Sequence, residues 1–429
     1  MKKQSQNFDV IIIGGGASGM MAAGVAGQNG AKVLLLEKNP KLGEKLKITG
    51  GGRCNITNAE FDNRVLLKKY GEGEQFFYSA FDQFGVKDTF EFFESKKLPI
   101  IVEASKRAFP ASQKALDVFL VLEKVLKDNN VVIKSNSKII SINSDGNKIS
   151  SVTDSDGTNY VANNYILATG GQSHPETGST GDGFFWLKKL GHTVVAPTPS
   201  IVPLSVKEKW ATSLSGNSLE FVRIDFYVNG QKKFKKKGKI LFTHFGISGP
   251  MILNSAKKVD DLLHEGIVTA TIDMYPELDH GALEQKIIKI FDSNKNKMLK
   301  NIFSEIVEPG TKDVILSLLP KIDSAKKVHS VTKEERKQIV FLLKNLPLTI
   351  NGLMGFDRAV VADGGVVLTE IDTKTMRSKL FKNLFITGDL LHVNRMSGGY
   401  SLQLCWTTGF VAGKNAVMNS DNSVAGNAS

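Results

Sequence analysis

The sequence predicts an α/β protein whose main domain is a Rossmann-like nucleotide-binding fold: three layers around a parallel sheet, with a small antiparallel meander. Two observations carry this prediction. The chain opens with a buried strand, a glycine-rich turn, a helix and a second buried strand, the order that begins a doubly wound parallel sheet. Glycine-rich strand ends return near the other end of the chain. The β-rich and then helical stretch between these two regions is therefore predicted to be an insertion.

The first nucleotide-binding element follows from residues 8–38. Residues 8–13 (FDVIII) and 32–38 (KVLLLEK) are apolar runs of strand length, and residues 22–29 are helical in composition. Between the strands lies the pattern Gly14-x-Gly16-x-x-Gly19. Its glycines permit a tight turn, close approach of the backbone to a pyrophosphate, and packing of the helix on the strand. Glu37 ends the second strand, where a carboxylate accepts hydrogen bonds from ribose hydroxyls, so this unit predicts a dinucleotide site.

The elements that complete this first region are a helix, a meander and a further strand. Residues 112–127 form a long apolar pattern, and Ser112 suits its N-cap. Asp145-Gly146 supplies a turn within a meander, whose expected strands are residues 131–134, 138–143 and 148–153. Residues 160–171 predict a strand that runs into glycine.

The inserted region begins near residues 197–203 (PTPSIVP), where the composition changes. An alternating strand ends at Asn229-Gly230, which predicts a hairpin with a type I′ turn, and residues 267–274 form another strand. Helical patterns follow, including the capping box of Thr332 and Glu335, until strand-rich sequence returns near Pro347. We therefore expect a nucleotide-binding domain in two parts (1–195 and 347–418), an inserted β-rich subdomain (196–279), an inserted helical subdomain (280–346) and a disordered tail (419–429).

Composition narrows the class of protein. The chain has 429 residues with 41% hydrophobic and 23% charged residues, which is typical of soluble globular proteins. Two cysteines exclude a disulfide framework and point to a reducing compartment. No apolar run is long enough for a membrane span and the start does not resemble a signal peptide, so we expect a cytoplasmic protein without a membrane partner. The formal net charge of +12 favours anionic partners, although a lysine-rich surface that aids solubility is the simpler interpretation.

Three further segments distinguish FAD from NAD, which the GxGxxG pattern alone cannot do. Residues 49–58 (TGGGRCNITN) leave backbone N–H groups free to face an anion or a flat ring, and Arg53 adds a charge. Residues 168–171 (ATGG) end a strand beside the same ligand. Asp389 follows a late strand and can hold a ribityl chain, and residues 397–403 (SGGYSLQ) open a helix whose N-terminus stabilises negative charge on a reduced ring. Contacts from both ends of the chain fit an extended FAD.

These segments resemble the BaiN-like (YhiN-like) family of bacterial NAD(P)/FAD-dependent oxidoreductases, within the glutathione-reductase-type FAD-binding superfamily. The motifs occur in the family's order over nearly the whole chain: KLKITGGGRCNITN (45–58), ATGGQSHPETGSTGDGF (168–184), LFTHFGISGP (241–250), TMRSKL (375–380) and GDLLHVNRMSGGYSLQLCWTTGFVAG (388–413). The resemblance implies FAD in a two-part Rossmann-like domain, with an inserted region over the flavin. Asp389, Asn394 and Ser401 stand where the family usually has glutamate, aspartate and asparagine, which affects the hydrogen bonds to the flavin rather than the choice of cofactor.

The expected cofactor-binding residues come from the glycine-rich segments and the acidic strand ends. They are Gly14, Gly16, Ala17, Ser18, Gly19, Glu37, Lys38, Lys45, Gly51, Gly52, Arg53, Cys54, Asn55, Ile139, Thr169, Gly170, Gly171, Gly388, Asp389, Gly399, Tyr400, Ser401 and Leu402. No metal site is expected, because no HExxH or His-x₃-His spacing occurs.

Three other features each allow two interpretations. Cys54 has no nearby partner cysteine, so it is expected to be a small residue packed near the flavin rather than a redox group. His244 precedes Ser248-Gly249-Pro250, a plausible helix start and anion site. His244 is a weak candidate for proton transfer, and such histidines more often order a loop. Residues 232–239 (KKFKKKGK) either bind RNA or an acidic surface, or protect an edge strand, and the second interpretation is preferred.

The predicted activity is hydride transfer between flavin N5 and a small organic substrate. No second GxGxxG with a terminal acid is present, so NADH or NADPH visits the flavin transiently or the electrons come from the substrate itself. A flavin oxidase of a small amino compound, an RNA-associated flavoprotein and a flavin-binding protein without turnover are the alternatives, although a nucleic-acid partner is not expected. The sequence leaves open the choice of reductase or oxidase and the oligomeric state.

Overall fold

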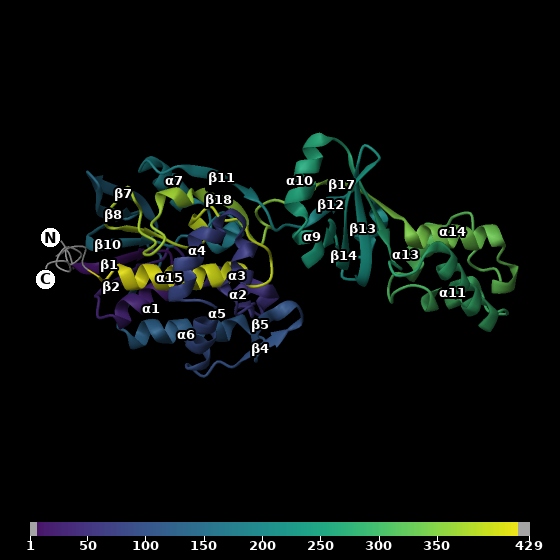
Figure 1. Cartoon of the computed structure of the whole chain (residues 1–429), viewed down its shortest axis with the longest axis horizontal. Helices are drawn as coiled ribbons and strands as arrows, with labels where there is room; N and C mark the ends of the chain where they lie inside the picture. The colour runs from purple at the N-terminus through teal and green to yellow at the C-terminus, as the bar shows by residue number, and fades with distance from the viewer. Residues whose placement is uncertain (1–6, 419–429) are drawn as a thin grey trace. The chain divides into compact units, whose positions relative to one another are not determined.

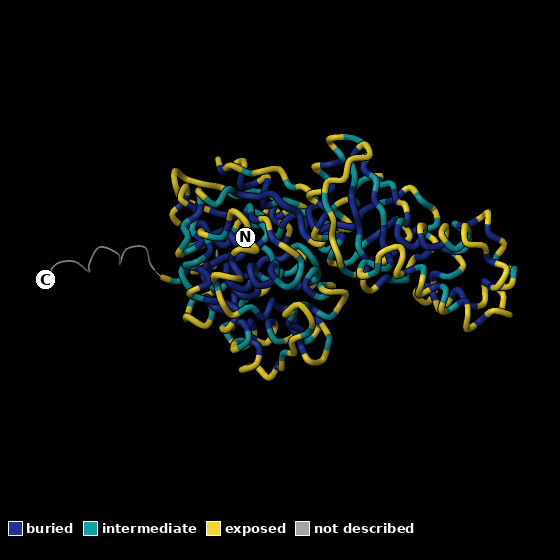
Figure 2. Tube along the Cα trace, turned by 45° about the vertical axis from the view of Figure 1, so that its right-hand side comes forward, coloured by how far each residue is buried: buried dark blue, intermediate teal, exposed yellow. Residues whose placement is uncertain are grey.

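The computed structural model describes residues 7–418, which form two compact units (Figure 1). Unit 1 contains the described residues up to Pro199 and from Val360 onward, and unit 2 is Ser200–Ala359. Each unit has its own core of buried apolar side chains, with exposed residues concentrated in its surface loops (Figure 2). No helix within residues 7–418 has the length and apolar character of a membrane span. The tail expected over residues 419–429 lies outside the described residues.

The boundaries of the insertion differ from the expected ones. Residues 347–359 belong to unit 2, although we expected them in the second part of the nucleotide-binding domain. The reason is strand β17 (Leu346–Leu353), which pairs with other strands of unit 2. At the other boundary, residues 196–199 stay in unit 1 because β11 (Val194–Pro199) pairs with β18 (Ala362–Val366).

Unit 1 is built on a parallel sheet with the strand order β19-β10-β1-β2-β6. The strands are β1 (Phe8–Ile13), β2 (Val33–Leu36), β6 (Val132–Lys134), β10 (Ala162–Leu167) and β19 (Leu384–Ile386). One assignment from the sequence is wrong: residues 131–134 do not join the meander. Leu34 pairs in parallel with Val132, so β6 is an edge of the main sheet. The meander consists of β7 (Ile139–Asp145), β8 (Lys148–Asp154) and β9 (Asn159–Tyr160).

Two helices from opposite ends of the chain pack closely in unit 1 (Figure 1). They are α1 (Ala17–Gln28) and α15 (Tyr400–Asn415). Glycines permit this approach, because a Cβ atom at Gly409 would lie 2.5 Å from the Ser18 carbonyl oxygen. Helix α6 (Ala115–Asp128) packs against a different side of α1, where a Cβ atom at Gly24 would lie 2.6 Å from a Val125 side-chain carbon, and its N-cap is Lys114 rather than the expected Ser112.

Further short elements complete unit 1. The helices are α2 (Glu44–Ile48), α3 (Asn63–Leu67), α4 (Glu74–Gln83), α5 (Val86–Glu94) and α7 (Asp182–Lys189). A small antiparallel sheet contains β3 (Thr57–Asn58), β5 (Arg107–Pro110) and β4 (Ile100–Glu103).

Unit 2 contains a closed barrel with the strand order β12-β15-β14-β13-β16-β17. The expected hairpin is formed by β13 (Ser218–Val228) and β14 (Gln231–Thr243), and Asn229 and Gly230 both have the positive φ that a type I′ turn requires. The remaining strands are β12 (Leu204–Val206), β15 (Gly246–Ser248) and β16 (Val268–Asp273). Alternate residues of β13 and β16 point inward, so Ile224, Phe226 and Ile272 fill the barrel.

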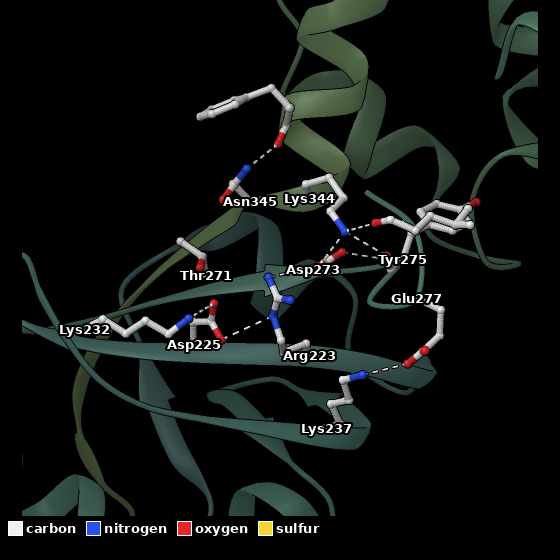
Figure 3. Close-up of polar contacts among 12 residues, drawn as sticks. Arg223, Asp225, Lys232, Lys237, Thr271, Asp273, Tyr275, Glu277, Lys344 and Asn345 are labelled. Atoms are coloured by element: carbon white, nitrogen blue, oxygen red, sulfur yellow. Dashed lines mark hydrogen bonds and ion pairs between the residues drawn. The ribbon is translucent and has the colours of Figure 1, made fainter. Parts of the chain in front are cut away.

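Helices surround this barrel and extend it. They are α8 (Lys209–Ser213), α9 (Pro250–Leu253), α10 (Ala256–Glu265), α11 (His280–Ser293), α12 (Leu299–Ile302), α13 (Lys312–Ser317) and α14 (Lys333–Lys344). Helix α14 starts with the expected capping box of Thr332 and Glu335. At its other end, Lys344 reaches Asp273 on β16 with an Nζ–Oδ2 distance of 2.7 Å (Figure 3).

Candidate functional site

The start of helix α1 is an open backbone surface. Its N-cap is Gly16, so no N-cap side chain accepts a hydrogen bond from the N–H groups of the first turn, and a Cβ atom built on Gly16 would meet nothing within 4 Å. Gly14 and Gly19 are different, because neither position has room for a side chain. A Cβ at Gly14 would lie 2.5 Å from the Ala168 carbonyl oxygen, and a Cβ at Gly19 would lie 1.9 Å from the Gly14 carbonyl oxygen. Two glycines therefore allow close packing, and Gly16 leaves the positive helix end accessible to an anion. Ala17 and Ser18 form the first turn.

A pocket lies beside this helix start, at the ends of β1 and β2. It is lined by Ile13, Gly14, Leu36, Glu37, Lys38, Ser137, Ile139, Thr169, Gly178, Asp182 and Trp186. The Glu37 carboxylate accepts hydrogen bonds from the N–H groups of Gly15 (2.7 Å) and Asn39 (2.8 Å). Burial raises the pKa of Glu37, while these N–H groups and the neighbouring Lys38 charge oppose the rise. The carboxylate is thus fixed at the wall of the pocket, as a contact to a polar ligand requires.

The segment after β10 borders the same pocket. Thr169 and the glycines Gly170 and Gly171 follow the strand, and the Thr169 hydroxyl oxygen is buried without a hydrogen-bond partner among residues 7–418. Further along, Lys38 Nζ pairs with Asp182 at 2.7 Å. The Lys38 ammonium is thereby neutralised by a residue that the sequence argument did not include.

The loop TGGGRCN adopts backbone conformations that favour glycine. Gly51 and Gly52 have φ values of 67° and 84°, and a Cβ atom at either position would meet nothing within 4 Å. The next side chain, Arg53, does not extend this open surface: it forms an ion pair with Glu103 and stacks on Phe109, with its guanidinium carbon 4.1 Å from the ring centroid. The charge expected from Arg53 beside the glycines is thus held in an ion pair with Glu103.

Cys54 is fully buried, and burial raises the pKa of its thiol to about 12. A thiol with such a pKa is not a nucleophile near neutral pH, in agreement with a packing role. Cys405 in α15 is only partly buried, and burial together with the neighbouring Asp389 charge raises the pKa of its thiol to about 12.

Asn55 connects the glycine loop to the start of α15. In the amide orientation that satisfies its hydrogen bonds, its oxygen accepts from the Gly399 N–H at 3.0 Å. Gly399 is the N-cap of α15, with φ of 100°, and no side chain caps the helix. A Cβ at Gly399 would lie 2.2 Å from the Thr57 carbonyl carbon, so only glycine allows this approach. A second uncapped helix start thus adjoins the loop of residues 49–58; Tyr400, Ser401 and Leu402 form its first turn.

The turn after β19 passes close to α1 and α15. A Cβ at Gly388 would lie 3.2 Å from Ser18 Cβ in α1 and 3.5 Å from Cys405 Sγ in α15. The next residue, Asp389, forms ion pairs with Arg395 and, at 3.6 Å, with Lys45. Both carboxylate oxygens therefore face cations of this chain.

Arg395 is the main residue that the sequence argument missed. It is buried, with 3% of its surface exposed, and it contacts Asp389 and Ser401, two of the expected site residues. The available signal in the sequence was its position between Asp389 and the SGGYS segment (397–401). An arginine buried there needs an anionic partner, and Asp389 is the nearby acid.

Most of the expected residues thus come together along one end of the parallel sheet, from Glu37 past Gly16 to Gly399. His244 is in unit 2, where it lies exposed in the turn between β14 and β15 with its ring against Phe245. The helix that follows it, α9, has only four residues, so the anion site expected at Ser248-Gly249-Pro250 lacks a helix of useful length.

The geometry fits a dinucleotide with a flat ring. The glycines at positions 16, 51 and 52 leave room for a ligand to approach the backbone, and the starts of α1 and α15 offer positive helix ends. The buried Thr169 hydroxyl, which has no hydrogen-bond partner among residues 7–418, could bond to a polar group of such a ligand. These features define the class of Rossmann-type, FAD-dependent oxidoreductases.

Comparison with known proteins gives the family within this class. Residues 8–415 match the model of the HI0933-like protein Rossmann domain, and the chain belongs to this family. It is 30% identical to a 3-dehydro-bile acid delta(4,6)-reductase of Clostridium scindens, over 94% of this chain and 98% of the relative. It is 28% identical to a ribosomal RNA dihydrouridine synthase of Haemophilus influenzae, over 95% and 98%.

A solved structure supports the fold. The 3-ketosteroid-delta4-(5alpha)-dehydrogenase from Rhodococcus jostii RHA1, in complex with 4-androstene-3,17-dione, aligns over 98% of both chains with a TM-score of 0.57 and 13% identity. At this identity the likeness concerns the fold alone.

Proposed function

We propose that the site in unit 1 holds FAD along the end of its parallel sheet. Glu37 would accept hydrogen bonds from the adenosine ribose, and the open start of α1 at Gly16 would face the diphosphate. Gly51, Gly52 and the start of α15 would face the flavin ring. The support for this assignment is that these separate segments converge in one unit, with open backbone at each place where a ligand must approach.

We propose that the reaction is reduction of a carbon–carbon double bond conjugated to a carbonyl group. Near-full-length relatives have names that describe such reductions, one on a 3-oxo bile acid and another on uridine. Bound FAD, once reduced by NADH or NADPH, would supply a hydride from N5 to one carbon of the double bond, and a proton from solvent would complete the addition at the other carbon. This near-full-length similarity is the observation that carries the proposal.

The residues of this chain would bind and orient the ring rather than take part in covalent chemistry. Cys54 and Cys405 have pKa values of about 12, raised first by burial, so neither thiol serves as a redox partner. The described part of the chain contains one GxGxxG unit, that of Gly14 to Gly19, and we propose that NADH or NADPH reduces the flavin in a transient encounter.

Anaerobic mixing tests this proposal. Protein reconstituted with FAD is mixed with NADH or NADPH while flavin absorbance is followed, and the reduced protein is then mixed with a 3-oxo-Δ4 steroid, cinnamate or oxygen. Reoxidation by an unsaturated carbonyl compound, with formation of the saturated product, is the expected result. Rapid reoxidation by oxygen alone, or flavin reduction by a small amine, would instead support the amine-oxidase alternative.

A second candidate function is dihydrouridine synthesis in RNA. It is favoured by the Haemophilus influenzae relative and by β14, where Lys235 and Lys236 are exposed and pair with no acidic side chain among residues 7–418. Reduced enzyme incubated with unmodified ribosomal RNA would then form dihydrouridine, detected by nucleoside mass spectrometry. Product from RNA and none from the small enones would assign this function instead.

A further inference from the structure

Arg395 places a permanent positive charge at the start of helix α15. Its side chain is buried, and its guanidinium donates hydrogen bonds to the Val393 carbonyl oxygen (2.8 Å), the Ser401 hydroxyl (3.0 Å) and Asp389. Ser401 is in the first turn of α15, whose N-cap Gly399 has no side-chain cap. Because arginine does not lose its proton in proteins, its charge adds to the positive end of the helix at any working pH.

Asp389 is the counter-charge of this cation and is shared with a second one. Arg395 approaches one carboxylate oxygen and Lys45 approaches the other at 3.6 Å. Burial opposes ionisation of Asp389, yet the charges of Arg395 and Lys45 lower its pKa below the ordinary value. The Asp389 carboxylate is therefore in contact with two cations, and Lys45 is also within electrostatic reach of the exposed Glu176.

We propose that Arg395 is a positioning residue that, with Asp389 and Lys45, sets the reduction potential of the flavin. This inference rests on the proposed binding of FAD beside the start of α15. Reduction adds negative charge to the flavin ring, and the buried Arg395 cation near the ring favours the reduced state because little solvent screens it. In this view Asp389 does not primarily hold the ribityl chain: it orients Arg395 and moderates its charge.

The two partners of the ion pair then have opposite effects, which a purely structural contact would not produce. Removal of the cation in Arg395→Met should lower the potential, whereas removal of the anion in Asp389→Asn should raise it. If the contact only stabilised the fold, both variants would weaken FAD retention and lower the melting temperature, without opposite shifts in potential. Arg395→Lys keeps the charge and should keep most of the wild-type potential.

Helix α2 offers a matched pair that does not disturb the buried guanidinium. Lys45 and Lys47 each have 23% of the side chain exposed, but Lys45 faces Asp389, whereas Lys47 pairs with Glu44 at 2.6 Å. Lys45→Met should lower the potential in the same direction as Arg395→Met. Lys47→Met should leave it unchanged.

The experiment is equilibrium reduction of the FAD-loaded proteins in the presence of a reference dye. We expect about a tenfold change in the equilibrium between protein and dye for Arg395→Met and Asp389→Asn, in opposite directions, which is about 30 mV for a two-electron couple. Loaded variants whose potentials move together, or a Lys45→Met protein indistinguishable from Lys47→Met, would overturn the inference alone. A wild-type protein that binds no FAD after reconstitution would overturn the proposed function as well.

Discussion

Replacing Lys344 with methionine should destabilise unit 2 strongly, because this lysine is a buried cation with three partners (Figure 3). Its ammonium pairs with Asp273 and donates hydrogen bonds to the carbonyl oxygens of Tyr275 (2.8 Å) and Leu278 (2.5 Å). The side chains of Lys344 and Asp273 are only 6% and 3% exposed. Methionine keeps much of the volume but leaves the carboxylate and both carbonyl groups without this donor.

The magnitude follows from the burial of the pair. Removing one partner of a buried ion pair costs about 3–5 kcal/mol, since the other charge stays away from water. Asp273 keeps its contact with Arg223, whose Nη2 lies 3.2 Å from Asp273 Oδ2, so we expect a value near the lower end, about 3 kcal/mol. For a cooperative unit of this size, each kcal/mol lowers the unfolding midpoint by about 2–4 °C, which gives roughly 6–12 °C.

Calorimetry of the full chain, with hydrogen exchange of the amides in residues 200–359, measures this effect. Lys237 provides the control, because it forms an ion pair of the same 2.7 Å length with Glu277, but both side chains are exposed (45% and 66%). Solvent screens that pair, so Lys237→Met should not change the midpoint measurably. Equal shifts for Lys344→Met and Lys237→Met would refute the argument that burial decides the value of the pair.

Three further predictions concern unit 1. Gly16→Ala should reduce FAD retention without lowering the melting temperature of the apo protein, because the added Cβ meets nothing within 4 Å. Gly19→Ala should lower that temperature, because its Cβ would lie 1.9 Å from the Gly14 carbonyl oxygen. Apo variants with the same melting temperature would contradict this prediction. Neither cysteine of the native protein should react with a thiol reagent at pH 8, and both should react after denaturation, because burial raises each thiol pKa to about 12. Burial lowers the pKa of His192, which contacts Glu370 and Ser378, so stability should be full above about pH 6.5 and fall as the pH decreases through the lower folded value. His192→Gln should flatten this decrease in melting temperature, and an unchanged pH profile would exclude the histidine as its source.

The sequence was sufficient to predict the strands, turns and helices that are specified by residues next to each other in the chain. The strand β1, the glycine turn, helix α1 and the acid at the end of β2 lie within residues 8–37, and the hairpin of β13 and β14 is specified by Asn229-Gly230. Long-range pairing was harder to predict. Residues 132–134 have the composition of a meander strand, yet their partner is Leu34–Leu36, about a hundred residues earlier in the chain. Strand β17 was assigned to the wrong unit because its partners are in β16 and β12.

The candidate site shows the same division. Backbone features such as the open glycines could be predicted, since a glycine pattern reports directly on backbone freedom. The partners of charged side chains could not. Arg53 faces Glu103, Lys38 faces Asp182 and Asp389 faces Arg395, and each of these partners comes from a segment that only the tertiary fold brings near.

The lysine-rich strand β14 shows why formal charge is a weak guide to partners. Residues 232–239 contain six lysines, but four of them pair with acids on β13 or nearby segments: Lys232 with Asp225, Lys233 with Glu265, Lys237 with Glu277 and Lys239 with Glu220. The segment therefore offers much less free charge than its sequence suggests. Only residues 241–243 of β14 pair with β15, so the lysine-rich part of β14 is unpaired along that edge. The lysines there discourage pairing of this edge with a strand of another chain. Support for an RNA substrate comes mainly from the dihydrouridine synthase relative, and the product assay tests it more directly than RNA affinity would.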